Sequence, residues 1–167
     1  MDNHLLRFQE KQFLFYDFET FNLNLHDSFN LPWQIAVKRV EVVNNDGKFF
    51  NKVLKVQEED SKAESKDFYL EWDSPLKIGE EAKRITRYSE RVFQNRKMPQ
   101  EEVFKIIYPL IEECDYMVGH NILGFDIYLL RNWYRANGKS YSHLAEKSLD
   151  TFAIAKAVAL DYKFNPL

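Results

Sequence analysis

Cysteine is nearly absent from this sequence, and long apolar runs are missing. Cys114 is the one cysteine among 167 residues, which excludes a disulfide framework and a cysteine-rich zinc site. No uninterrupted apolar run approaches the length that crosses a bilayer, and residues 1–12 contain no apolar core of a signal peptide. A single thiol without these features is typical of a reducing compartment, so we expect a cytoplasmic protein with no membrane partner.

An excess of positive charge is also missing. The 23 Lys and Arg residues are outnumbered by 26 Asp and Glu residues, which leaves a net charge of −3. The sequence therefore lacks the general basic footprint of a nucleic-acid-binding domain. It still allows an enzyme that holds nucleic acid through metal ions, because bound cations can be the largest local charges in a site. Seven basic residues are candidates for a phosphate-facing patch, although a solvated face explains most of them equally well: Lys38, Arg39, Arg84, Arg87, Arg91, Arg96 and Lys97.

Aromatic residues, by contrast, make up 16% of the chain, with 14 Phe and 9 Tyr. Such residues dominate the energetics of a core, and this is the expected role of most of them. A few exposed rings could instead stack on unpaired bases. Composition alone does not choose between these roles.

The apolar pattern predicts one α/β domain over residues 1–167. Three strands joined in part by the turn residues 44–47 form an antiparallel meander, and the later strands alternate with helices, which indicates a mixed sheet with flanking helices. That order resembles a ribonuclease-H-like fold. Residues 58–66 are charged and predict an exposed loop. The expected strands cover residues 12–18, 33–43, 49–56, 116–119 and 148–150. The expected helices cover residues 76–84, 99–113, 125–136 and 151–159.

Two acids at the end of the first strand are the central feature of the sequence. Asp17 and Glu19 are two residues apart, so their side chains lie on the same face of a strand. Two neighbouring carboxylates repel each other and lose hydration, which favours a compensating cation. Carboxylate oxygens suit Mg²⁺ or Mn²⁺. The alternative for this pair alone is that both acids are simply solvated.

A second segment adds a third acid. The strand at 116–119 is followed by His120 and Asn121, a glycine-containing loop, and a helix that begins near Asp126. An acid at a helix N-terminus is often only a favourable charge. However, open α/β sheets place their sites at the carboxyl ends of strands, so Asp126 is expected to face Asp17 and Glu19.

Four segments in consistent order resemble the DnaQ-like (DEDD) 3′→5′ exonuclease family. Residues 13–20 (FLFYDFET) resemble its first motif, an apolar strand ending in D-x-E-T. Residues 120–126 (HNILGFD) resemble its second motif, H-N-x-x-F-D, with one extra residue. Residues 149–156 (LDTFAIAK) are similar to its D-T-x-x-L-A-R stretch, and residues 85–88 (ITRY) stand where the family often has I-T-G-[IV]. The resemblance covers residues 12–156.

The resemblance implies a two-metal phosphodiesterase that removes nucleoside monophosphates from a 3′ end. It implies that Asp17 bridges two ions, that Glu19 serves the ion holding the attacking water, and that Asp126 serves the second ion. Two ions can clamp both oxygens of an in-line displacement. It also implies a pocket for the terminal nucleotide. The residues predicted for this pocket and its surroundings are Thr20, Phe21, Thr86, Tyr88 and Asn121.

One part of the family pattern is missing. The family has a third motif on a late helix, with His or Tyr as general base and an Asp four or five residues later as the last metal ligand. After Asp150 the only acid is Asp161, with no His or Tyr at that spacing before it. We therefore assign neither role to any residue, and we expect a domain truncated before its last helix, with weak turnover or none.

Two polar residues near these motifs have less specific interpretations. Asp150 precedes a helix, so N-capping is expected, with a supporting role at the metal site as the alternative. His120 is expected to have a structural or hydrogen-bonding role.

The leading functional prediction is a metal-dependent 3′→5′ exonuclease that uses Mg²⁺ or Mn²⁺ and acts on a single-stranded or frayed 3′ end, with DNA favoured. An exoribonuclease is the near alternative, because the choice depends on recognition of the 2′-OH. The second class is a non-catalytic binding or structural module, with a polymerase or the remainder of a longer chain as partner.

Overall fold

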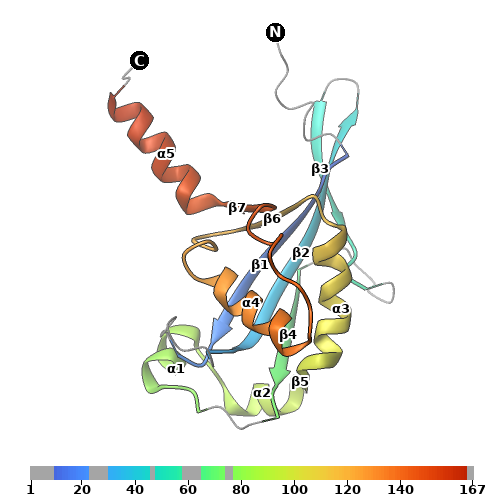
Figure 1. Ribbon diagram of the computed structural model, residues 1–167, viewed down its shortest axis with the longest axis vertical. Coiled ribbons are helices and arrows are strands. Elements are labelled where there is room, and N and C mark those ends of the chain that lie inside the picture. The colour runs from blue at the N-terminus through green and yellow to red at the C-terminus, as the bar shows by residue number, and fades with distance from the viewer. Residues whose placement is uncertain (1–9, 23–29, 46–47, 58–64, 74–76, 165–167) are drawn as a thin grey trace.

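The computed structural model of the protein describes residues 10–22, 30–45, 48–57, 65–73 and 77–164. Their strands form one mixed sheet, and helices lie against it (Figure 1). The strands are β1 Gln12–Thr20, β2 Pro32–Asn45, β3 Lys48–Leu54, β4 Lys66–Glu71, β5 Lys97–Pro99, β6 Tyr116–Gly119 and β7 Ser148–Asp150. The helices are α1 Glu80–Thr86, α2 Glu90–Arg96, α3 Gln100–Glu113, α4 Asp126–Ala136 and α5 Thr151–Phe164.

The sheet has the order β5-β4-β2-β1-β6-β7, and β3 pairs with β2 beside β4. β1 pairs antiparallel with β2, and β2 pairs antiparallel with β3, which confirms the expected meander. β6 runs parallel to β1, and β7 runs parallel to β6. The predicted α/β class with a ribonuclease-H-like mixed sheet is therefore confirmed.

Two strands and one helix were not predicted from the sequence. β4 pairs antiparallel with residues 34–37 of β2, and β5 pairs parallel with β4. β4 has three consecutive buried residues and β5 has only three residues, so neither shows the alternation that identifies a strand. The missed helix, α2, has seven residues and one buried apolar side chain, which is too short for a helical period.

Several predicted boundaries were also displaced. The helix expected at 76–84 is α1, which begins at Glu80, and residue 76 lies outside the described residues. The last helix continues past residue 159 to Phe164. Most of the charged segment at 58–66 lies outside the described residues, and its last residue, Lys66, begins β4.

One face of the sheet is covered by α3 and α4 (Figure 1). Leu14, Tyr16 and Phe18 of β1 are buried in the core that these helices share with the sheet. The ring of Phe18 meets that of Trp133 in α4 edge-on, with centroids 6.0 Å apart. This burial fixes the register of β1, because a shift by one residue would expose these three side chains.

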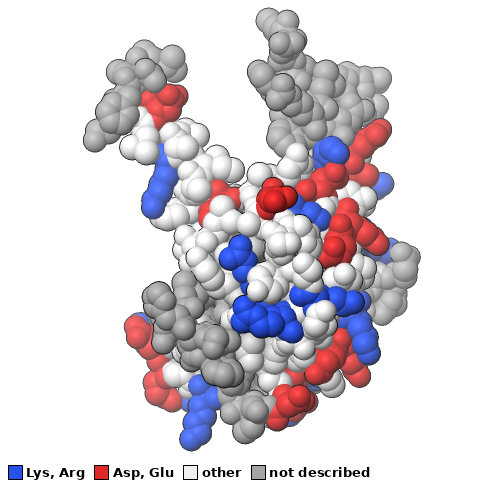
Figure 2. All heavy atoms as spheres, viewed as in Figure 1, with Lys and Arg blue, Asp and Glu red and all other residues white. Residues whose placement is uncertain are grey.

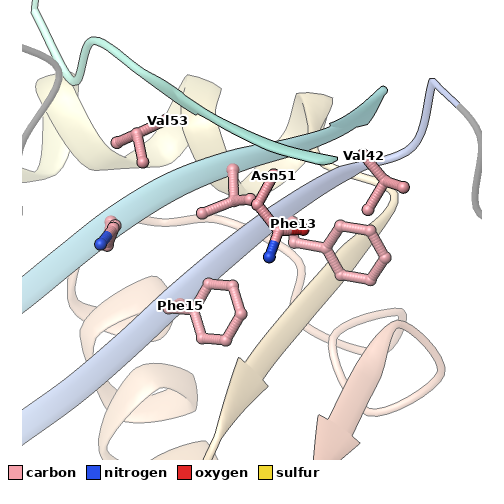
Figure 3. A pocket seen from close by; sticks show the side chains of 7 residues that line it. Phe13, Phe15, Val42, Asn51 and Val53 are labelled. Carbon is pink, nitrogen blue, oxygen red and sulfur yellow. The ribbon is translucent and has the colours of Figure 1, made fainter. Parts of the chain in front are cut away.

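The other face of β1 presents the alternate residues. Phe13 and Phe15 line a hollow of about 460 Å³ with side chains from β2 and β3. Figure 3 shows these side chains on the side of the strands away from the helices behind them. Since side chains alternate along a strand, Asp17 and Glu19 belong to the same side as Phe15.

α5 begins directly after β7 and extends away from the sheet (Figure 1). Its described side chains are exposed, apart from a half-buried Phe152. Among the described residues, no helix combines the length and the apolar character that crossing a bilayer requires.

Candidate active site

Asp126 reaches β1 at the residue between the two predicted acids. Its Oδ1 accepts a hydrogen bond from the backbone N–H of Phe18 at 2.9 Å. This N–H is available because the pairing of β1 with β6 ends at Phe15 and Val118. Asp126 is the first residue of α4 and is only 3% exposed. Its carboxylate accepts the N–H that a longer β6 would otherwise pair with. The backbone connection thus places Asp126 beside the segment that carries Asp17 and Glu19.

The three acids influence one another electrostatically. Burial raises the pKa of Asp126 to about 7, against the opposing effect of the Phe18 N–H, and the charges of Asp17 and Glu19 raise it further. Burial also raises the pKa of Asp17. The pKa of Glu19 is raised by burial and then by the charge of Asp17. A group of carboxyls with raised pKa values is an environment that a bound cation would stabilise.

The donor chemistry of these side chains fits a divalent cation, because all their ligand atoms are carboxylate oxygens. The positions of these carboxylates, however, do not yet form a metal-binding group. Within the ranges that the structure describes, no three His, Cys, Asp or Glu side chains form a group that could hold a metal ion as they stand. Like-charged carboxylates repel one another, which opposes a closed cluster.

Asp150 connects the segment before α4 to the start of α5. Its Oδ1 accepts hydrogen bonds from the N–H groups of Phe152 at 2.9 Å and Ala153 at 3.3 Å, which confirms the predicted N-cap. The same carboxylate accepts from Asn121 at 2.9 Å and from Leu123 at 3.0 Å. Burial alone would raise the pKa of Asp150, but these four N–H groups together lower it. Asp150 therefore holds the loop that delivers Asp126.

This loop contains the extra residue that departs from the family motif. It is closed by a hydrogen bond from Gly124 N–H to the Asn121 carbonyl at 3.0 Å and by one from Ile127 N–H to the Ile122 carbonyl at 2.8 Å. Asn121 has a φ of 58°, a left-handed conformation that Asn tolerates better than most residues. The additional residue is thus absorbed within the loop, and Asp126 still reaches Phe18.

Gly119 is a positioning residue that the sequence analysis missed. A Cβ at this position would lie 2.3 Å from Ile122 Cγ2 and 2.8 Å from the Tyr16 carbonyl oxygen. Only a glycine lets the end of β6 and the following loop pack this closely on β1. The available signal was a glycine at the end of a buried strand, directly before His120.

His120 is exposed and lies next to α5. Its Nδ1 is 3.3 Å from the Thr151 hydroxyl, and its ring centroid is 5.2 Å from that of Phe152. These contacts agree with the predicted structural or hydrogen-bonding role. Asn121 is also exposed, and its backbone N–H donates to Asp150.

The remaining predicted contacts fall into two groups. Thr20 is buried, and its hydroxyl donates to the Asn22 carbonyl at 2.8 Å. The Thr86 hydroxyl donates to the Ala82 carbonyl at 2.7 Å within α1. Both hydroxyls are therefore used inside the protein. Phe21 and Tyr88, in contrast, line the same pocket of about 350 Å³.

This pocket is mixed in character. Its aromatic lining includes Trp72 and Phe93, and its polar lining includes Glu71 and Lys97, which form an ion pair. Behind it the ring of Tyr88 meets that of buried Trp33 edge-on, with centroids 5.0 Å apart. Phe21 is connected to the segment before α1 by a hydrogen bond from Gly79 N–H to the Phe21 carbonyl at 3.1 Å.

Several solved complexes of exonuclease I have a similar fold. The E. coli enzyme with a dT13 oligonucleotide superposes with a TM-score of 0.67 at 18% identity, covering 89% of this chain and 30% of that one. A product-bound exonuclease I gives 0.68 at 18% identity, covering 90% and 32%. The zinc-bound E. coli ExoI–ssDNA complex gives 0.67 at 18% identity, covering 95% and 31%. At this identity the likeness concerns the fold, and the chain spans about a third of the length of these proteins.

The comparison with sequence families gives a more specific result. No curated protein sequence matches the chain. A family model described as RNase_T exonuclease matches residues 14–165, a range that includes most of β1 with its two acids, the Asp126 loop and all of α5. The match extends over far more than half of the chain and agrees with the ribonuclease-H-like sheet. The chain therefore belongs to the RNase_T exonuclease family, the DnaQ-like group that its motifs resemble.

Proposed function

We propose that the chain carries the core of a metal-dependent 3′→5′ exonuclease that hydrolyses phosphodiester bonds at the end of a single strand. The observation that carries this proposal is the hydrogen bond between Asp126 and the backbone of Phe18. It brings a buried carboxyl with a raised pKa to the strand segment of Asp17 and Glu19. Carboxyl groups with raised pKa values that lie together at a strand end are typical of a functional site, and a bound cation would stabilise their charged forms.

In this proposal Asp17, Glu19 and Asp126 hold two ions, Mg²⁺ or Mn²⁺. Such ions supply a hydroxide nucleophile near neutral pH and neutralise charge on the phosphate. The protein contributes placement. Phe18 anchors Asp126, and Asp150 fixes the loop that precedes it. No described residue is assigned as general base or as a fourth ligand.

The pocket between Phe21 and Tyr88 is proposed to receive a base of the substrate strand. Phe21 follows Asp17 by four residues, which is about 13 Å along an extended strand. The rings offer a stacking surface that tolerates any base. Glu71, Asp73 and Glu90 also line the pocket, so it suits the amino groups of a base better than a phosphate. Asn121 is proposed as an additional substrate contact from the loop on the other side.

DNA is proposed as the favoured substrate. Exonuclease I structures with similar folds contain single-stranded DNA oligonucleotides, which supports this choice. RNA is the alternative, and side-by-side hydrolysis of matched DNA and RNA oligonucleotides distinguishes them. A polymerase or further parts of a longer chain are proposed as partners.

A non-catalytic binding or structural module is the second candidate. It is favoured by one observation: among the described residues, no three potential ligands form a preassembled metal group. In that case the domain would bind nucleic acid or a partner without turnover.

The two candidates are separated by an assay with Mn²⁺ and a 5′-labelled oligonucleotide. The proposed function predicts a ladder of products shortened from the 3′ end and release of nucleoside monophosphates. Asp17→Ala and Asp126→Ala should each abolish the products. Metal binding by calorimetry without any product would favour the non-catalytic module. Products that persist unchanged in both variants would refute the site assignment.

A further inference from the structure

The outer side of α4 and the segment after it carry cations that are matched with aromatic rings. We define the α4 cationic surface by three cations and three rings. Its members are Arg131, Arg135, Lys139, Tyr108, Tyr128 and Tyr141.

Negative charge is excluded from this part of the sequence. Residues 127–145 contain no Asp or Glu, although the whole chain has a net charge of −3. Figure 2 shows Lys and Arg side chains gathered over the area where α4 and the neighbouring part of α3 lie. Glu112 in α3 borders this area, where it accepts a hydrogen bond from Tyr134 at 3.0 Å and lies 3.1 Å from His143 Nε2.

Each cation of the surface is held over a ring. Arg131 Cζ lies 5.8 Å from the ring centroid of Tyr128, and Arg135 Cζ lies 5.5 Å from that of Tyr141. Lys139 Nζ lies 4.9 Å from the ring centroid of Tyr108. These distances are within the range of cation–π attraction, which orients a cation without neutralising it.

The three cations also have no carboxylate partner among the described residues. None of them forms a salt bridge with any residue in the described part of the chain, whereas Arg96 pairs with Asp67, and Lys97 pairs with Glu71. Arg135 donates instead to the Tyr141 hydroxyl at 3.4 Å, and this hydrogen bond and the charge of Arg135 lower the pKa of Tyr141. The positive charge is therefore oriented but unneutralised, which suits an anionic ligand.

The surface starts next to the proposed active site. α4 begins at Asp126, and the outward residues 128, 131 and 135 follow at the three- and four-residue spacing of one helix face. Arg135 lies nine residues after Asp126, which is about 14 Å along the helix axis. Tyr128 is 43% exposed in the first turn and offers a ring at the beginning of this face.

We propose that the α4 cationic surface binds the sugar-phosphate backbone of a single nucleic-acid strand upstream of its 3′ end, with Tyr128 as a stacking position. The proposal rests on the proposed function, because the strand is taken to be the substrate of the adjoining site. Oriented cations beside an exposed ring recognise a single strand independently of its base sequence. The surface would let a chain with a net negative charge bind a negatively charged polymer, because its positive charge is concentrated in one region.

The test compares two variants with the same loss of charge. The first is Arg131→Gln/Arg135→Gln/Lys139→Gln. The matched control removes three exposed lysines from other elements: Lys52→Gln/Lys55→Gln/Lys77→Gln. The affinity of each protein for a fluorescein-labelled oligothymidylate is measured in EDTA over a range of salt concentrations. Hydrolysis of the p-nitrophenyl ester of thymidine 5′-monophosphate with Mn²⁺ is measured in parallel, because this small substrate does not reach the surface.

The surface variant should lose at least about tenfold in oligonucleotide affinity, while the control stays close to wild type. Each phosphate contact to a single strand contributes about 0.7 to the slope of log affinity against log salt, so loss of three contacts should flatten the slope by about 2. Ester hydrolysis should be unchanged. If the triple variant fails to fold, Arg135→Gln/Lys139→Gln leaves the partly buried Arg131 intact and should flatten the slope by about 1.4.

Equal affinity and slope in the surface variant and wild type would overturn the inference, as would an equal loss in the control. Failure of the proposed function gives a different result. In that case wild type hydrolyses neither the ester nor the oligonucleotide, yet the surface variant still loses affinity and salt dependence.

Discussion

Asp150 Oδ2 accepts a hydrogen bond from the backbone N–H of Leu123 at 3.0 Å, across 27 positions of sequence. The residue that caps α5 therefore also holds the loop in front of α4. Because Asp126 follows this loop directly and hydrogen-bonds to Phe18, three segments are connected at the carboxyl ends of β1, β6 and β7. The carboxylates of Asp126 and Asp150 are thus held by backbone N–H groups, some of them from segments distant in the sequence.

Asp126→Asn should separate metal binding from folding. The amide oxygen can still accept the Phe18 N–H, while the buried charge and its repulsion by Asp17 and Glu19 are lost. We expect Mn²⁺ affinity, measured by calorimetry, to fall at least about tenfold, which corresponds to about 1.4 kcal/mol. Exposed Asp73→Asn is the matched control and should retain wild-type affinity. Wild-type Mn²⁺ affinity in Asp126→Asn would contradict the assignment of this ligand.

The raised pKa of Asp126 also predicts how stability depends on pH. The folded protein keeps this proton up to about pH 7, whereas the unfolded chain releases it near 3.8. The folded state therefore binds more protons within this window, and the free energy of unfolding contributed by Asp126 falls as pH rises. Because one pKa unit corresponds to about 1.4 kcal/mol, a rise from 3.8 to about 7 should give a loss of about 4 kcal/mol. Urea unfolding of wild type and Asp126→Asn without metal, at both ends of the window, measures the difference. A wild-type stability that rises relative to Asp126→Asn would contradict the raised pKa.

Asp150 should have two separable effects. Asp150→Ser can still cap α5 through its hydroxyl but loses the bonds to Asn121 and Leu123, whereas Asp150→Ala loses both functions. We expect Asp150→Ala to lower the free energy of unfolding by about 2 kcal/mol and Asp150→Ser by about 1 kcal/mol. Urea unfolding measures these values. Both variants should lower Mn²⁺ affinity, because the loop no longer fixes Asp126.

The lowered pKa of Asp150 gives the opposite pH dependence from that of Asp126. Its stabilisation is present above the ordinary pKa of 3.8 and is lost as pH falls through the lower value of the folded state. The stability difference between wild type and Asp150→Ala should therefore shrink in acid. A difference that grows in acid would show that the carboxylate is not the stabilising form.

Gly119→Ala should disturb the site through the backbone. The added methyl would meet Ile122 and the Tyr16 carbonyl, and we expect a loss of about 1–3 kcal/mol in the free energy of unfolding together with weaker Mn²⁺ binding. Gly138→Ala is the comparison, because Gly138 has a φ of +64° and no neighbour within 4 Å of an added Cβ. Its cost of about 1 kcal/mol should come from the backbone alone, with Mn²⁺ affinity unchanged. Unaltered stability and metal affinity in Gly119→Ala would contradict the close approach of this loop to β1.

Tyr88 tests the proposed base pocket. Tyr88→Ala removes a ring that lines the pocket, and loss of one stacking contact of about 1–3 kcal/mol predicts a KM for an oligonucleotide raised about tenfold or more. Tyr88→Phe keeps the ring and removes only the exposed hydrogen bond to Glu90, so its KM should stay near wild type. Equal KM values for Tyr88→Ala and wild type would exclude this ring as a base contact.

Much of the fold could be predicted because its strongest signals are local. The apolar and aromatic run of residues 12–18 predicted β1, and the apolar stripe of α3 recurs at helical spacing between Val103 and Ile111. β5 could not be predicted, because a strand of three residues has almost no period of its own. Its place at the sheet edge depends on β4, to which it adds as a parallel neighbour.

The sequence predicted a candidate site of three converging acids but not the contacts of the residues around it. Motif spacing identified Asp17, Glu19 and Asp126, and capping chemistry identified Asp150. It did not indicate that Thr20 and Thr86 use their hydroxyls internally, whereas Phe21 and Tyr88 share a pocket. Those distinctions depend on which partners are brought near by distant segments.

The sequence by itself determined most of the longer elements, the family and the types of side chain available for chemistry, since these follow from residue identity and short-range periodicity. Only the tertiary structure decided that Asp126 bonds to Phe18, that Asp150 secures the loop before Asp126, and that Arg131 and Arg135 lie over tyrosine rings. The physical reason is the sequence distance over which each kind of signal acts. Periodicity acts over a few residues, while hydrogen bonds and charges act between groups that become neighbours only when the sheet assembles.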